Sequence, residues 1–109
     1  MKEVIYRDGI RQSAELGVLA PQATKLLEEI LGASGGLVTA EWDRGEDARG
    51  QAVVILRLSD FSGSVTATFE PTELESPAHL RARLRRLWGE LLQVRSHKQL
   101  QELLGASGG

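Results

Sequence analysis

The residues of this chain that are best suited to chemistry are arginines gathered in one stretch. Four of them fall within residues 81–86, and two further cations follow before residue 99. Guanidinium groups match phosphate oxygens through paired hydrogen bonds, so such a cluster can bind an anionic partner. The candidate anionic-partner surface consists of Arg81, Arg83, Arg85, Arg86, Arg95 and Lys98.

Patterns for catalysis or metal binding are not found elsewhere in the sequence. The two histidines, His79 and His97, are not spaced as metal ligands, and the chain has no cysteine. Asp43, Glu46 and Asp47 lack the alternating pattern of a calcium loop, so we expect a solvated turn there. Nucleophile motifs and phosphate-binding glycine loops are also missing. The sequence therefore predicts no enzyme, no metal and no cofactor.

Charge is distributed unevenly along the chain, although the net charge is only −2. Residues 12–75 hold eleven acidic and four basic side chains, a net charge of −7. Residues 76–109 hold six basic and two acidic side chains, a net charge of +4. Two regions of opposite charge permit either binding of an anion or docking between copies of the chain, and we favour docking.

The arginine cluster lies on a helix that we expect over residues 77–94. Ser76 is a suitable N-cap residue, and Pro77 suits the first helical position. Apolar residues recur at spacings of three, four and seven, which predicts a buried stripe of Leu80, Leu84, Leu87, Trp88, Leu91 and Leu92. The arginines fall outside that stripe, where their stems can also cover the edge of a core.

Three strands are predicted before the basic helix. Residues 37–43 and 64–70 alternate between apolar and polar side chains, whereas residues 53–56 are apolar on both faces. The apolar middle strand suggests a second covering element, either the N-terminal segment or another subunit. A helix over residues 20–31 and a possible strand over residues 2–7 complete the pattern. The predicted fold is α+β, an antiparallel three-stranded meander with a possible fourth, N-terminal strand, in the order (β)-α-β-β-β-α-α.

The length and composition favour one domain over residues 1–109. We divide it into an N-terminal segment (1–19), an α-β-β-β-α core (20–94) and a short helix with a glycine-rich tail (95–109). Ser96 and Gln99 have the spacing of a capping box that would begin this last helix. The absence of a signal-peptide pattern and of a long apolar run predicts a cytoplasmic protein outside the membrane.

A ten-residue pattern occurs twice, as LEEILGASGG at 27–36 and as LQELLGASGG at 100–109. One interpretation is that a leucine-rich helix with a glycine cap is a common way to end a helix. The other is a duplication whose second helix supplies an apolar face to a neighbouring chain. On this second interpretation the candidate self-association residues are Leu100, Leu103 and Leu104.

The α-β-β-β-α order of residues 21–94 is similar in topology to double-stranded-RNA-binding domains, in which a basic second helix contacts phosphates. Two features depart from that family. The loop over residues 44–50 is rich in acidic residues, and the family's lysine cluster is only loosely matched by His79, Arg81 and Arg83. We therefore predict a non-catalytic protein-interaction or adaptor module that associates with itself or with another protein. The alternative is an RNA- or DNA-binding domain that uses helix 77–94.

Overall fold

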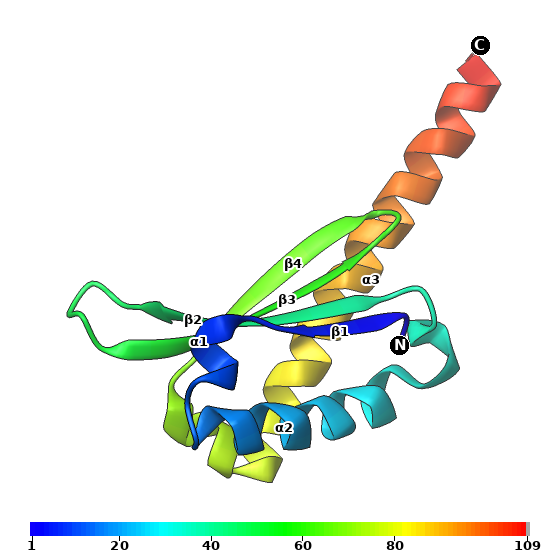
Figure 1. The fold of residues 1–109 in the computed structure, drawn as a ribbon. Coiled ribbons are helices and arrows are strands. Elements are labelled where there is room, and N and C mark those ends of the chain that lie inside the picture. The colour runs from blue at the N-terminus through cyan, green and yellow to red at the C-terminus, as the bar shows by residue number, and fades with distance from the viewer. Residues whose placement is uncertain (109) are drawn as a thin grey trace.

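The protein folds around one four-stranded sheet with two long helices (Figure 1). The computed structural model describes residues 1–108, and side-chain surroundings for residues 1–105. The elements in chain order are β1 (Glu3–Tyr6), α1 (Asp8–Arg11), α2 (Leu16–Leu31), the 3-10 helix η1 (Gly32–Gly35), β2 (Thr39–Glu46), β3 (Ala52–Asp60), β4 (Gly63–Phe69), the 3-10 helix η2 (Pro71–Glu75) and α3 (Pro77–Gly108). The α+β class and the fourth, N-terminal strand are confirmed.

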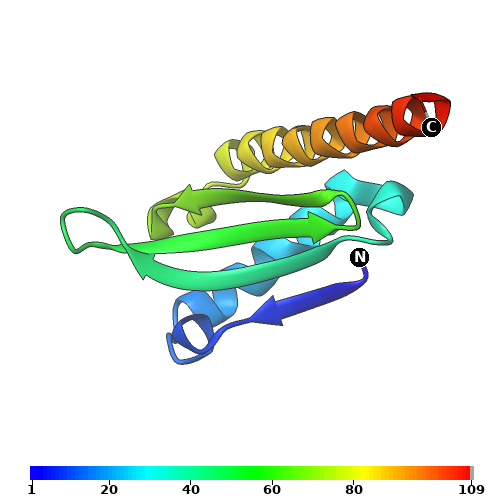
Figure 2. The ribbon, with the colours of Figure 1, turned by 90° about the horizontal axis from the view of Figure 1, so that it is seen from above.

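The sheet has the strand order β1-β2-β3-β4. Strands β2, β3 and β4 form the predicted antiparallel meander, whereas β1 pairs with β2 in parallel, with Val4 opposite Ala40. A parallel pair needs a crossover connection, and α1 and α2 provide it. The Tyr6 hydroxyl donates a hydrogen bond of 3.0 Å to Thr24 Oγ1 and so joins β1 to α2. Figure 2 shows α2 crossing the sheet and α3 running along its β4 side.

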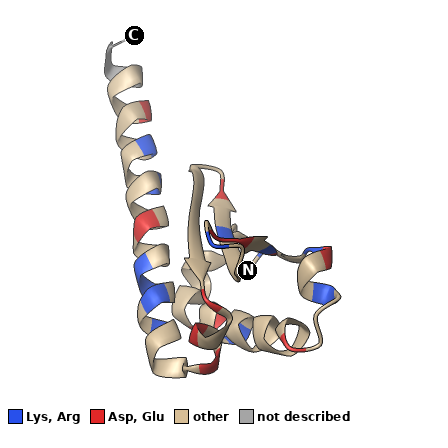
Figure 3. Ribbon diagram, turned by 90° about the vertical axis from the view of Figure 1, so that its left-hand side faces the viewer, with Lys and Arg blue, Asp and Glu red and all other residues tan. Residues whose placement is uncertain are grey.

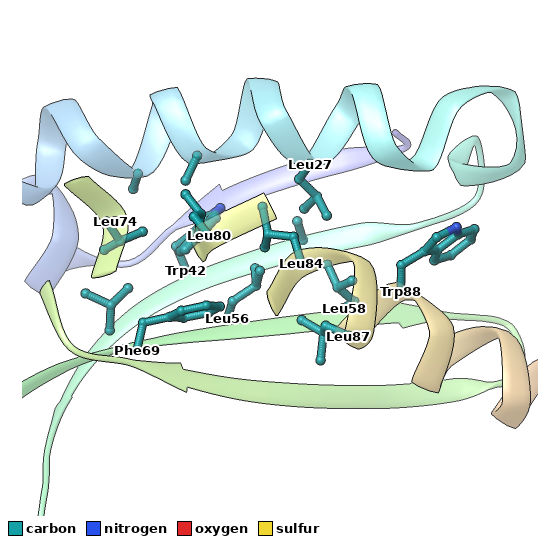
Figure 4. Close-up of a cluster of buried hydrophobic side chains, with 14 of the residues drawn as sticks. Leu27, Trp42, Leu56, Leu58, Phe69, Leu74, Leu80, Leu84, Leu87 and Trp88 are labelled. Carbon is teal, nitrogen blue, oxygen red and sulfur yellow. The ribbon is translucent and has the colours of Figure 1, made fainter. Parts of the chain in front are cut away.

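The core lies between the helices and one face of the sheet (Figure 4). Trp42 from β2 and Leu56 from β3 point into it, and both are fully buried. The helices contribute the buried side chains Ala20, Ala23, Leu27, Leu31, Leu80, Leu84, Leu87, Trp88 and Leu91. Leu92 is the exception to the predicted α3 stripe, because it is 37% exposed.

The opposite face of the sheet carries exposed side chains, among them Arg57, Thr66 and Thr68. The sequence suggested that the N-terminal segment could cover this face. In the structure β1 instead pairs along the edge of β2, and Ile55 on the open face is only half-buried. On this face of β3 the next side chain after Ile55 is the charged Arg57. The apolar run of β3 therefore does not continue along the open face of the sheet.

Helix α2 begins at Leu16, earlier than the predicted start at residue 20, and it contains Pro21. The Leu16 amide donates to the Ser13 hydroxyl at 3.2 Å, which satisfies a helix-start donor. Pro21 removes the donor that would bond to the Gly17 carbonyl, but burial of Leu16 and Ile10 compensates for that loss. Since Ile10 and Leu16 belong to the core, residues 1–19 are an integral part of the fold.

Helix α3 corrects the prediction of two C-terminal helices, because it runs without a break from Pro77 to Gly108. Residues 94–104 contain no proline or glycine and are rich in strong helix formers, so the capping pattern at Ser96 does not interrupt the helix. Its length is about 48 Å. The last turns project beyond the β3–β4 turn (Figure 1). Gly109, the end of the predicted tail, lies outside the described residues.

Replacement of glycine by alanine should stabilise the protein at one position and destabilise it at another. A Cβ atom at Gly89 would meet nothing within 4 Å, whereas a Cβ at Gly35 would lie 2.5 Å from Leu31 Cβ. Gly89→Ala should raise the free energy of unfolding by about 0.8 kcal/mol, because alanine is the better helix former. Gly35→Ala should lower it by about 2 kcal/mol through overpacking. Urea unfolding followed by circular dichroism measures both, and shifts of the same sign would contradict this account.

Candidate functional site

The six predicted cations all lie on α3: Arg81, Arg83, Arg85 and Arg86 on its first half, and Arg95 and Lys98 farther along, and Figure 3 shows basic residues on both parts of the helix. Arg85 and Arg86 are exposed to solvent. Arg81 Nη2 lies 3.8 Å from Glu29 Oε2 on α2, with the Glu29 side chain 67% exposed. Such an exposed, long ion pair contributes little to stability. Arg85 and Arg86 are thus the exposed members of the cluster, and Arg81 is half-buried.

Arg83 has a structural role. Its Nη1 donates to the Thr68 carbonyl at 2.8 Å and to Glu73 Oε2 at 3.1 Å. The guanidinium carbon lies 4.4 Å from the centre of the Phe69 ring, within the range of a cation–π contact. Arg83 therefore joins α3 to the end of β4 and to η2.

Glu73, the acidic partner of Arg83, receives several hydrogen bonds. Its Oε1 pairs with His79 Nε2 at 2.9 Å, and its Oε2 accepts the Glu70 amide at 2.8 Å. Burial opposes ionisation, but the hydrogen bonds from His79 and Glu70 and the charge of Arg83 outweigh it and hold the pKa of Glu73 below its ordinary value. His79, like Arg83, therefore joins the first turns of α3 to Glu73 in η2.

Arg95 makes the corresponding contact near the other end of β4. Its Nε and Nη2 donate to Asp60 Oδ2 at 3.0 and 2.7 Å. The guanidinium carbon also lies 5.3 Å from the centre of the Trp88 ring and 5.6 Å from that of Phe61. Lys98 Nζ donates to the Phe61 carbonyl at 3.2 Å. These two cations therefore hold the β3–β4 turn against α3.

Asp60, the acidic partner of Arg95, is more deeply buried than Glu73, the acidic partner of Arg83. Its side chain is fully buried, while that of Arg95 is 18% exposed. Burial opposes ionisation, but hydrogen bonds from Ser62 and Arg95 outweigh it and keep the pKa of Asp60 below its ordinary value. The carboxylate is consequently charged at neutral pH and paired inside the fold.

The structure thus divides the predicted anionic-partner surface into two groups. Arg83, Arg95 and Lys98 donate hydrogen bonds to other parts of the chain, whereas Arg85 and Arg86 are exposed and Arg81 makes only the long ion pair with Glu29. Sequence reasoning could not separate the groups, because the acceptors Thr68, Asp60 and Phe61 come from distant positions.

A groove that sequence reasoning missed runs between β4 and α3, with a volume of about 290 Å³. Because β4 is the last strand of the sheet, no strand among residues 1–108 lies beside its outer edge. The groove is lined by Thr66, Ala67, Thr68, Arg83, Arg86, Leu87 and Glu90. The sequence held one signal, an uncharged strand without proline over residues 63–69.

The candidate self-association residues lie on the projecting turns of α3. Leu100, Leu103 and Leu104 are 53%, 65% and 62% exposed, respectively. Leucines exposed to this extent on one helix form an apolar surface of the kind that proteins bury against a partner.

The predicted acidic turn is shorter in the structure, because Asp43 and Glu46 belong to β2 and only Asp47 lies in the turn. Asp47 Oδ1 accepts hydrogen bonds from the Arg49 and Gln51 amides at 2.8 and 2.9 Å, and so closes the β2–β3 connection. No group of three or more potential metal ligands comes together within the described part of the chain. Across those same residues, none of the helices combines the length and apolar character needed for a membrane span.

Comparisons with known proteins find no matching family model, no similar curated protein and no similar solved structure. The likeness to double-stranded-RNA-binding domains therefore rests on element order alone. Fold-level likeness does not establish function, so any functional argument depends on the surfaces described above.

We predict that Asp60→Asn lowers the free energy of unfolding by about 2 kcal/mol at pH 7, because Arg95 loses a charged acceptor. In the unfolded chain the pKa of Asp60 is near 3.8, and in the folded chain it is lower. The stability due to the carboxylate is therefore present above that value and lost as pH falls through the folded pKa.

Denaturant unfolding from pH 7 down to pH 3 measures the difference in free energy of unfolding between wild type and Asp60→Asn. This difference should be constant above about pH 5 and should shrink in more acidic solution. Asp8→Asn, which breaks the exposed pair with Arg11, is the matched control and should change little. A difference that does not depend on pH would refute the assignment of stability to the Asp60 charge.

Proposed function

We propose that this chain is a non-catalytic protein-interaction module that self-associates through the projecting turns of α3. The observation that carries the proposal is the exposure of Leu100, Leu103 and Leu104, each more than half accessible. Burying a leucine side chain stabilises a contact by about 2 kcal/mol. Two copies of this helix segment provide one another with an apolar surface.

The length of α3 supports the same proposal. Residues 99–105 are all exposed, so this segment extends as a helix away from the sheet. Isolated helical segments are marginally stable in water, and most helices gain their stability by packing an apolar face. Contact with a second copy supplies that packing.

We expect wild type to self-associate and the variant Leu100→Gln, Leu103→Gln, Leu104→Gln to have a lower weight-average mass at every concentration. Glutamine is a good helix former, so α3 should persist while its apolar surface is lost. Sedimentation equilibrium measures the masses. The control Val18→Gln, Leu37→Gln removes exposed apolar side chains elsewhere and should behave as wild type. A strictly monomeric wild type, or an unchanged mass in the leucine variant, would disprove the proposed contact.

The alternative function, binding of RNA or DNA, draws its support from the exposed Arg85 and Arg86. It is weakened because Arg83, Arg95 and Lys98 have partners within the chain. Contacts to several phosphates must lose affinity steeply as salt rises. We expect fluorescence anisotropy of labelled duplex RNA and DNA to show no such binding. Tight, salt-sensitive binding that Arg85→Ala, Arg86→Ala abolishes would instead establish the alternative.

A further inference from the structure

The two edges of the sheet differ in their protection. Strand β1 is short, spans Glu3–Tyr6, and is bordered by the charged residues Lys2, Arg7 and Asp8. Strand β4 spans Gly63–Phe69 and contains neither a charged residue nor a proline. Charges, proline, short length and a covering helix are the usual means by which proteins prevent edge strands from pairing. Strand β4 lacks the first three, and α3, which runs along this side of the sheet, leaves a groove beside the strand.

The hydrogen-bonding groups on the outer edge of β4 can be assigned. Arg83 donates to the Thr68 carbonyl from α3, so this carbonyl points away from β3. In an antiparallel strand, alternate residues direct both their N–H and their C=O groups to the same side. Ser64, Thr66 and Thr68 therefore present their N–H and C=O groups at the outer edge. Their side chains are exposed on the open face of the sheet.

We propose that β4 pairs with β4 of a second copy, antiparallel, about a two-fold axis at Thr66. The pairing joins two four-stranded sheets into one continuous sheet. In this register Thr66 exchanges two hydrogen bonds with Thr66 of the second copy, and Ser64 pairs with Thr68 of that copy. The Thr68 carbonyl has two lone pairs, so it accepts the new hydrogen bond while it keeps that from Arg83.

Side chains across the new pairing are compatible. Thr66 faces Thr66, and Thr68 faces Ser64, so hydroxyl-bearing side chains meet without opposed charges. Cross-strand pairs between threonines, or between threonine and serine, stabilise antiparallel sheets. The edge strand is therefore complementary to itself.

The wall of the groove favours a second copy over an unrelated peptide. Arg86 and Glu90 stand one helical turn apart on α3 beside Thr66 and Thr68. A two-fold axis reverses the order of the two residues, so that Arg86 of each copy approaches Glu90 of the other. One arrangement thus forms two attractive pairs, whereas an unrelated strand provides no such reciprocal match.

This inference rests on the proposed function in one respect, which is that the chain self-associates. Its surface is different, because the leucines lie on the projecting turns of α3 and the groove lies along β4. The two contacts can consequently be removed separately.

The first test places like charges across the axis. Thr66→Lys brings two lysines directly opposite one another, and the exposed position should leave the fold intact. We expect it to raise the dissociation constant of the β4 contact at least tenfold in the leucine-substituted background, as measured by sedimentation equilibrium. Thr39→Lys makes the same change on β2, away from the edge, and should leave the constant unchanged. Equal effects of the two substitutions would overturn the proposal.

The second test is charge exchange. Arg86→Glu and Glu90→Arg should each weaken the contact several-fold, and the double variant should restore it to near the wild-type value. Amide hydrogen exchange gives an independent measure, because the Thr66 and Thr68 amides should become more protected as protein concentration rises. Failure of the double variant to recover, together with exchange that does not depend on concentration, would overturn the proposal.

The outcomes separate the two contacts. If the leucine variant is monomeric and Thr66→Lys has no effect on wild type, the β4 inference fails and the proposed function stands. If Thr66→Lys alone abolishes association, the inference stands and the leucine contact fails. A monomeric wild type at all concentrations overturns both.

Discussion

Helix α3 packs on the sheet through its buried apolar stripe, and two arginine contacts join it to the two ends of the edge strand β4. Arg83 holds the end of β4 through Thr68, and Arg95 holds the β3–β4 turn through Asp60. The two arginines are separated on the helix by about 18 Å. Thr68 and Gly63, which pairs with Asp60, are separated along β4 by about 17 Å. Because the two distances match, α3 runs alongside β4 for the full length of the strand.

These contacts also explain what the uneven charge of the sequence does. The acidic span and the basic span meet within one molecule, where Asp60 and Glu73 accept hydrogen bonds from Arg95 and Arg83. A carboxylate that loses hydration, wholly as in Asp60 or partly as in Glu73, needs hydrogen bonds and opposite charge in compensation, and the lowered pKa values of both acids reflect this compensation. Opposite charges from the acidic and the basic span of the sequence thus pair with one another within the folded chain.

The elements with a clear hydrophobic period could be predicted from the sequence, and those set by distant contacts could not. Alternation in β2 and β4 and the apolar stripe of α3 identify the meander and its main helix. The GASGG repeat shows the limit of local patterns. Gly32 adopts a φ of 55° and ends α2, because the chain must turn back into β2, whereas Gly105 lies within α3. Identical residues take different conformations because the first copy leads into β2, whereas the described residues of the second continue α3.

The groove beside β4 follows from the same geometry. Near Gly63 the helix approaches so closely that an added Cβ would lie 3.0 Å from Val94 Cγ1. Towards Thr68 the contact is instead made by the long side chain of Arg83, which spans the gap between helix and strand. The groove opens beside this contact, with Thr66 and Thr68 of the strand on one side and Arg83 and Glu90 of the helix on the other. Arg83 therefore both joins α3 to β4 and lines the groove beside the strand edge.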